Sequence, residues 1–252
     1  MQIDLVFIVL MLGHILGDFY FQSDKMVKRR QEKYSAVLLH SLIYTLTIAV
    51  VMHLCVQFSV TLIYLFAALS ISHFVIDTIK HIIQKYSDGT CSWLKQHILG
   101  IDQLLHFSTF VGFWFLWGRN AQVRWFVSQE MVHLPDLPIT MLLGILLAVR
   151  PVGIWIAGSN LRNYWPQQPN SDLSFGSTKN GGKTIGYLER LIVLVFLMYQ
   201  QFGAIAFVLT AKSVARFKEI EQNQDRAEYY LIGTLMSVGS AILIAVLLGL
   251  TQ

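Results

Sequence analysis

Long apolar runs follow one another along this chain, separated by short polar stretches. Most runs are about 20 residues long, the length that an α-helix needs to cross the hydrocarbon core of a bilayer. The pattern predicts an all-α polytopic bundle of about seven transmembrane helices, forming a single integral membrane domain over residues 1–252. The predicted spans are residues 3–21, 36–58, 60–83, 98–117, 139–157, 185–210 and 230–250.

Histidine and aspartate side chains interrupt the first four runs, mostly in pairs spaced four residues apart. Residues four apart share one face of a helix, so each pair presents an imidazole and a carboxylate together. The set consists of His14 and Asp18, His40 alone, His73 and Asp77, and Asp102 and His106.

The positions of these groups alternate as the helices alternate in direction. They fall late in the first and third runs and early in the second and fourth runs. Because consecutive spans cross the membrane in opposite directions, all seven groups are expected in the same half of the bilayer. Ionisable residues inside a membrane are rare and usually functional. We therefore expect one polar site shared by four helices.

The donor set of this predicted site indicates a metal ion. Four imidazoles and three carboxylates suit zinc, with manganese or iron as alternatives, whereas calcium and magnesium prefer oxygen ligands. A metal-bound water could supply hydroxide for attack on an ester, amide or phosphoester. The favoured ligands are Asp18, His73, Asp77 and His106, followed by His14, His40 and Asp102. Asp18 and Asp102 are also candidate catalytic bases.

Further polar residues are candidates for substrate binding. Gln22, Lys25, Lys80 and Gln103 flank the His–Asp pairs and could line the mouth of the site. The alternative for the two lysines is that their side chains simply extend to the membrane interface. An acidic and a basic residue in the sixth run either form an ion pair between helices or hold an anionic headgroup through the arginine. These candidates are Gln22, Lys25, Lys80, Gln103, Glu189 and Arg190.

Composition agrees with a membrane protein, since only 13% of residues are charged and 54% are hydrophobic; soluble domains carry about 25% charged residues. The net charge of +4 resides in short loops, and no basic patch interleaved with aromatics indicates nucleic-acid binding. Membrane lipids are the expected partners. The basic loop of residues 22–35 predicts a cytoplasmic side there and an outer N-terminus. The first run lacks signal-peptide features and is expected to remain as a helix.

The second half of the chain is harder to orient. Seven spans place residues 212–228 outside, although this segment holds four basic residues. Arg150-Pro151 predicts a kink or break, and a re-entrant segment there would change the side on which the later loops lie. Residues 118–138 are expected to include a short amphipathic surface helix. The polar stretch of residues 158–184 is expected to be a cytoplasmic loop.

Several segments carry a resemblance to known proteins. They are HILGDFYFQSDKM, LLHSLIY, SHFVIDTIK, GIDQLLH, GGKTIGYLERLIVL and AKSVARF. Together they resemble a family of bacterial inner-membrane proteins with a domain of unknown function, which implies a multi-pass protein of the bacterial inner (cytoplasmic) membrane and no particular activity. The pairs are also similar in style to membrane-bound metal-dependent hydrolases, such as ceramidase-like enzymes that hold zinc with His and Asp, although the order here is H-x3-D, H-x3-D and D-x3-H rather than H-x3-H.

Three functions fit these observations. The first is a metal-dependent hydrolase that acts on a lipid or lipid-linked substrate at the cytoplasmic leaflet. The second is a carrier or channel for a metal ion or protons, since intramembrane acids and histidines serve there too. The third is a non-enzymatic membrane partner, in which the polar network only fixes helix packing.

Overall fold

The computed structural model describes residues 4–86, 92–124, 138–158, 181–215, 217, 221 and 224–251. These residues are helical apart from turns, short connections and one isolated antiparallel bridge between Val56 and Val123. The predicted all-α membrane bundle is confirmed. Within the described ranges, five helices are long and apolar enough to cross a membrane, and a bent pair at the N-terminus makes a sixth if it counts as one span.

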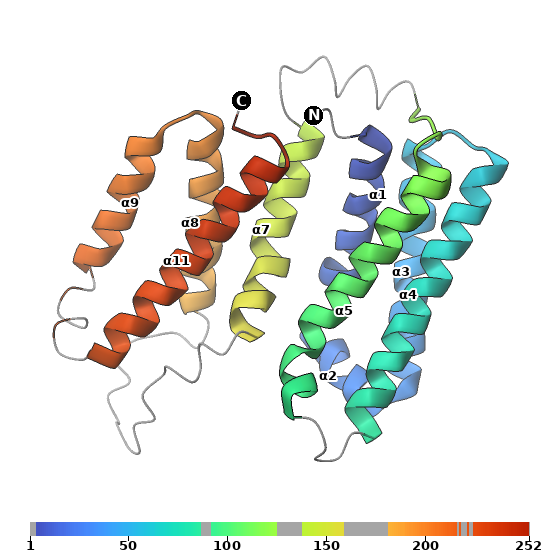
Figure 1. Ribbon diagram of the computed structural model, residues 1–252, viewed down its shortest axis with the longest axis horizontal. Helices are drawn as coiled ribbons and strands as arrows, with labels where there is room; N and C mark the ends of the chain where they lie inside the picture. The colour runs from blue at the N-terminus through green and yellow to red at the C-terminus, as the bar shows by residue number, and fades with distance from the viewer. Residues whose placement is uncertain are drawn as a thin grey trace. The chain divides into compact units, whose positions relative to one another are not determined.

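The chain divides into two compact units, Met1–Ile139 and Thr140–Gln252, which are described separately. Unit 1 contains α1 (Leu5–Ile15), the π-helix η1 (Leu16–Tyr20), α2 (Asp24–Glu32), α3 (Tyr34–Cys55), α4 (Val60–Tyr86), α5 (Ser92–Phe113) and the π-helix η2 (Trp114–Gly118). The described helices of unit 2 are α7 (Pro138–Gly158, which begins just before the unit), α8 (Gly181–Met198), α9 (Phe202–Ala215) and α11 (Gln224–Leu247) (Figure 1).

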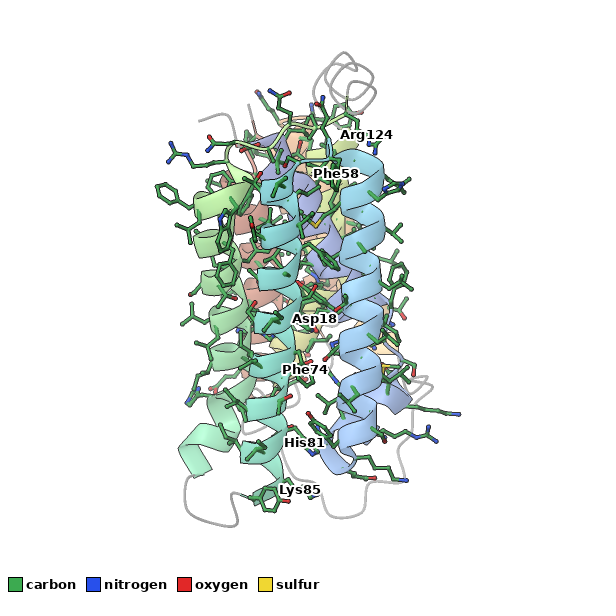
Figure 2. All side chains as sticks on the ribbon, turned by 90° about the vertical axis from the view of Figure 1, so that its right-hand side faces the viewer. Asp18, Phe58, Phe74, His81, Lys85 and Arg124 are labelled. Carbon is green, nitrogen blue, oxygen red and sulfur yellow. The ribbon has the colours of Figure 1, made fainter. Side chains whose placement is uncertain are left out.

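In unit 1, α3 packs against α1 on one side and α4 on the other, and α4 also packs against α5. Buried apolar side chains such as Leu10, Ile48 and Leu65 fill the interior, while leucines and isoleucines on the outer faces of α3 and α4 are exposed. Such an apolar exterior is what lipid chains require of a membrane helix. Figure 2 shows Asp18 between the two ends of these helices, which Phe58 and Lys85 mark.

Two glycines bring α1 close to α3. A Cβ atom at Gly13 would lie 3.1 Å from Ile48 Cδ1, and one at Gly17 would lie 3.3 Å from Tyr44 Cα. Small residues at four-residue spacing let the backbones of membrane helices approach each other. Each glycine immediately precedes a member of the first His–Asp pair, so this close packing directs the pair towards α3.

A short basic helix replaces the loop predicted for residues 22–35. α2 is bent by 78° from the preceding helix. Ser23 Oγ accepts a hydrogen bond from Met26 N at 3.2 Å, Asp24 lies in the first turn and Arg29 and Arg30 lie in the last. This N-cap and this order of charges favour a helix. α2 packs against α3 and α4, so that it lies beside these two helices.

The single span predicted over residues 185–210 is wrong. α8 ends at Met198 and α9 begins at Phe202. Gln200 has a φ of 55°, and the N–H groups of Gln200 and Gln201 donate to Leu197 O and Phe196 O at 3.1 and 2.8 Å. These two bonds form a Schellman cap, which ends a helix and reverses the chain. α8 and α9 are therefore a helical hairpin (Figure 1).

The hairpin changes where the following segment lies within unit 2. Lys212 Nζ, in the last turn of α9, lies 2.8 and 2.7 Å from the two carboxylate oxygens of Glu189 in α8. The end of α9 is thus level with the first half of α8, at the end of the unit where α8 begins. The seven-span order had placed residues 212–228 at the opposite end.

Other predictions have mixed outcomes. α7 continues as a helix through Arg150-Pro151 instead of breaking there. α5 begins at Ser92 rather than near residue 98, so Asp102 lies in the middle of its helix and not at its start. The predicted surface helix within residues 118–138 and the predicted loop over residues 158–184 fall largely outside the described residues.

Candidate metal centre

Asp18 and His40 form the first contact of the centre. Asp18 lies in the π-helical turn η1, whose wide spacing is closed by a hydrogen bond from Phe21 N to Leu16 O at 2.9 Å. Such π-helical turns are frequent at functional sites. The Asp18 side chain reaches α3, where His40 Nε2 lies 3.2 Å from Asp18 Oδ1. Both side chains are buried.

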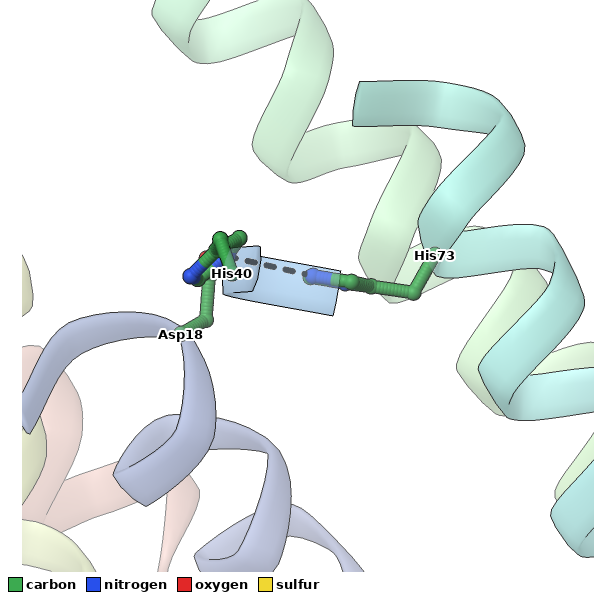
Figure 3. A group of neighbouring side chains, drawn as sticks. All are labelled: Asp18, His40 and His73. Carbon is green, nitrogen blue, oxygen red and sulfur yellow. Dashed lines mark hydrogen bonds and ion pairs between the residues drawn. The ribbon is translucent and has the colours of Figure 1, made fainter. Parts of the chain in front are cut away.

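His73 and Asp77 bring two further potential metal-ligand atoms close to His40 Nε2. His73 Nε2 of α4 lies 3.3 Å from His40 Nε2, and Asp77 Oδ2 lies 3.4 Å from His40 Nε2 and 3.5 Å from His73 Nε2. Figure 3 shows the His73 side chain directed towards His40, which lies next to Asp18. His40 Nε2 of α3 therefore lies within 3.4 Å of three potential ligand atoms from two other helical segments.

Several of these spacings are close to the edge of a coordination tetrahedron, and Asp18 and Asp77 belong to different candidate groups. When donors surround an ion at about 2.0–2.2 Å, neighbouring donors in a tetrahedron lie roughly 3.3–3.6 Å apart. The separations around His40 Nε2 run from 3.2 to 3.4 Å. Two overlapping groups could hold an ion, and they share one histidine: Asp18, His40 and His73, and His73, Asp77 and His106.

His106 of α5 presents a defined nitrogen. Its Nδ1 lies 2.8 Å from the backbone oxygen of Asp102 and must carry the proton, because a carbonyl only accepts. Nε2 is then an acceptor, and it is buried without a hydrogen-bond partner among the described residues. A fixed tautomer with a free lone pair is what a histidine ligand needs. The His106 ring lies 4.5 Å from the His73 ring, centroid to centroid.

Ion pairs compensate part of the negative charge of the centre. Arg30 Nη1, from α2, donates to Asp77 Oδ2 at 3.0 Å, and Lys80 Nζ donates to Asp102 Oδ2 at 2.6 Å. The three buried carboxylates Asp18, Asp77 and Asp102 carry −3 against +2 from these two cations, so with neutral histidines the centre has a net charge of −1. An additional cation is electrostatically favoured there.

Two glutamine side chains form hydrogen bonds with the aspartates of the centre. Gln103 Nε2 lies 3.2 Å from both Asp18 Oδ2 and Asp102 Oδ2, so it bridges two carboxylates. Gln22 Nε2 donates to the backbone oxygen of Asp18. Asp102 Oδ1, in contrast, is buried without a hydrogen-bond partner in the described part of the chain and could accept a proton from a bound water.

The remaining predicted residues have different surroundings. His14 lies beside it, with its ring centroid 5.9 Å from that of His106 and 6.1 Å from that of His73. Lys25 is exposed on α2. Glu189 and Arg190 belong to unit 2, where Glu189 pairs with Lys212.

Two residues that the sequence analysis did not assign to the site contact it, and a third contacts one of these two. Tyr44 stacks on His73 and bonds to His14, Arg30 pairs with Asp77, and His81 Nδ1 lies 2.7 Å from the backbone oxygen of Arg30. Tyr44 follows His40 by four residues, and His81 follows Asp77 by four residues. Extending the four-residue spacing by one turn would have found both, whereas Arg30 depends on the bend before α2.

Comparison with known proteins supports a family but no activity. No curated protein and no solved structure matches the chain. The matching family, described as a protein of unknown function, covers residues 6–134, and this range contains all seven histidines and aspartates of the predicted centre. Because the match extends over half of the sequence, the chain belongs to the DUF3307 family.

Proposed function

We propose that unit 1 binds a divalent metal ion, with zinc favoured over manganese or iron, and hydrolyses a bond in a lipid or lipid-linked substrate at the cytoplasmic leaflet of a bacterial inner membrane. The observation that carries the proposal is the crowding of donor atoms around His40 Nε2. Asp18 Oδ1, His73 Nε2 and Asp77 Oδ2 all lie within 3.4 Å of it. Mixed nitrogen and oxygen donors at such spacing suit these ions.

The neighbouring residues have distinct roles in this proposal. A bound ion would supply a water of lowered pKa as nucleophile. Asp102 would accept the water proton at Oδ1, while Lys80 and Gln103 hold Oδ2 and fix the carboxylate. His106 would complete the ligand set through Nε2. The exposed apolar faces of α3 and α4 suit contact with lipid, which supports the proposal of a substrate with an apolar chain.

A second candidate is a polar network that only fixes helix packing. The ion pairs Arg30–Asp77 and Lys80–Asp102 favour it, because they satisfy two of the three carboxylates without a metal. Buried charges inside a membrane protein are commonly paired in this way. The two candidates differ in whether the centre holds a metal ion.

Elemental analysis of detergent-purified protein distinguishes them. The wild type should contain a stoichiometric divalent ion, and Asp77→Asn should lose it. Asp24→Asn, which replaces an exposed aspartate of α2, is the control and should retain the ion. Thermal unfolding of each variant shows whether it is folded. A folded wild type that takes up no zinc, manganese or iron from a chelator-free solution would contradict the metal centre and favour the structural network. Metal-loaded protein would then be assayed on lipid esters, amides and phosphates.

A further inference from the structure

An open cavity of about 600 Å³ lies entirely within unit 2. It is lined by the last turns of α7, the first half of α8, the last turn of α9 and residues 229–237 of α11, helices whose arrangement Figure 1 shows. Its wall combines apolar side chains, including Ile154, Ile156 and Ile185, with three cationic side chains. Such a mixed wall suits a ligand with a charged head and an apolar part.

Arg190 is the central cation of this wall. It is only 3% exposed. Its Nε donates to Ala148 O, Nη2 donates to Val149 O at 3.4 Å, and Nη1 donates to Ser237 Oγ at 3.2 Å. The hydrogen-bond partners of Arg190 among the described residues are thus two carbonyls and a hydroxyl, all of them neutral.

The acidic residue next to Arg190 is occupied elsewhere. Glu189 directs both carboxylate oxygens to Lys212 Nζ, which also donates to Thr234 Oγ1 at 3.0 Å. The cationic lining residues Lys183, Arg190 and Lys212 carry +3 against −1 from Glu189, so the cavity wall has a net charge of +2. A buried cation with neutral partners is unfavourable in an apolar environment unless an anion joins it.

Two glycines of the cavity wall lie against the guanidinium. A Cβ atom at Gly186 would lie 3.3 Å from Arg190 Nη1, and one at Gly153 would lie 3.4 Å from Nη2. Both glycines line the cavity. A guanidinium has five N–H donors, and the described hydrogen bonds use three of them. The rest of this planar fork matches the geometry of phosphate oxygens.

We propose that this cavity is a binding site for a phosphate group, held by Arg190 and Lys183. Lys183 is exposed at the rim, and its Nζ lies 5.9 Å from the centroid of the Tyr187 ring. Lys212 is held by Glu189 and contributes less. The phosphate could belong to a lipid headgroup, whose chains would contact the isoleucines of the wall, or to a small free phosphate. This site is independent of the metal centre and its proposed reaction.

Isothermal titration calorimetry of the full-length protein in detergent tests the proposal with three probes. They are dihexanoyl phosphatidic acid, dihexanoyl phosphatidylcholine and inorganic phosphate. Phosphatidic acid should bind at least about tenfold more tightly than phosphatidylcholine, whose choline offsets the phosphate charge. If phosphatidic acid binds and inorganic phosphate does not, the ligand is a lipid headgroup. If both bind, the site recognises the phosphate group itself. Binding of neither, or equal binding of the two lipids, overturns the proposal.

Two variants with matched controls locate the site. Lys183→Gln should weaken binding of the phosphate probe by at least about fivefold. Lys85→Gln, an exposed lysine of unit 1 that also lies over a tyrosine ring, should leave it unchanged. Gly186→Ala should weaken binding by covering Nη1, whereas Gly203→Ala, where a Cβ meets no atom within 4 Å, should not. Wild-type affinity in both Lys183→Gln and Gly186→Ala overturns the proposal. Asp77→Asn should bind the probe normally, which separates this site from the metal centre.

Discussion

The phenol ring of Tyr44 lies flat against the imidazole of His73, with ring centroids 3.6 Å apart and an interplanar angle of 5°. The Tyr44 hydroxyl lies 3.0 Å from His14 Nδ1. One buried side chain of α3 thus holds an imidazole of α4 and an imidazole of α1. Groups that orient metal ligands in this way influence metal affinity although they do not touch the ion.

Replacement of Tyr44 by phenylalanine tests this orienting role. The ring would still stack on His73, but His14 would lose its hydrogen bond, so zinc affinity should fall about tenfold or more. Competition with a chromogenic zinc chelator measures the change. Tyr64→Phe, an exposed tyrosine on α4, is the matched control and should bind like the wild type. Unchanged affinity in Tyr44→Phe would show that the hydroxyl has no part in metal binding.

Arg30 should compete with a metal ion for Asp77. Its Nη1 lies 3.0 Å from Asp77 Oδ2, the same oxygen that faces His40 Nε2 and His73 Nε2. Removing this positive charge in Arg30→Gln should strengthen zinc binding by roughly tenfold, or about 1.4 kcal/mol. Arg29→Gln removes an exposed charge from the same helix and serves as the control. Weaker zinc binding in Arg30→Gln would instead mean that Arg30 positions the carboxylate for the ion.

The glycine contact between α1 and α3 has a measurable effect on stability. Gly17→Ala places a methyl group 3.3 Å from Tyr44 Cα, a backbone atom that cannot move without the helix. Such overpacking should lower the free energy of unfolding by about 1–3 kcal/mol. Gly112→Ala, with no atom within 4 Å of the new Cβ, should be neutral or stabilising by up to about 1 kcal/mol. Thermal unfolding in detergent compares the two; equal unfolding temperatures would contradict close packing at Gly17.

The α8–α9 hairpin predicts which ends of unit 2 share a side of the membrane. In a Cys55→Ser/Cys91→Ser background, Gly182→Cys and Glu221→Cys should react with a membrane-impermeant maleimide from the same side. Gln200→Cys, in the turn of the hairpin, should not react from that side. Labelling of Gly182→Cys and Glu221→Cys from opposite sides would restore the single span over residues 185–210. Intact and inside-out vesicles provide the two orientations.

The sequence pattern predicted the helices and the meeting of four of them better than it predicted their ends. A glycine with a φ of 67°, Gly249, ends α11 in the way such residues commonly do, and the predicted span ended beside it. Gln200 adopts a similar conformation without being a glycine, so its cap is not visible in the sequence. The length of the apolar run then favoured one helix where the chain forms two.

The residues of the candidate site were likewise predicted only in part from the sequence. Five of the seven predicted residues belong to the two groups that could hold an ion: Asp18, His40, His73, Asp77 and His106. Helix periodicity made them predictable, because it sets which side chains of one helix share a face. Arg30 could not be assigned in this way, since only the 78° bend before α2 directs its side chain to Asp77. Tyr44, in turn, resembles any other core aromatic until its contacts with two histidines are known.

The α8–α9 hairpin also bears on the thickness of the surrounding bilayer. The 14 residues of α9 extend about 21 Å at 1.5 Å per residue, well short of a hydrocarbon core of about 30 Å. A helix of this length fits beside lipid where the bilayer thins locally or where the Gln200–Gln201 turn lies below the opposite headgroups. Short-chain lipids relieve this hydrophobic mismatch. The protein should accordingly be more stable in bilayers of short acyl chains than in thick ones.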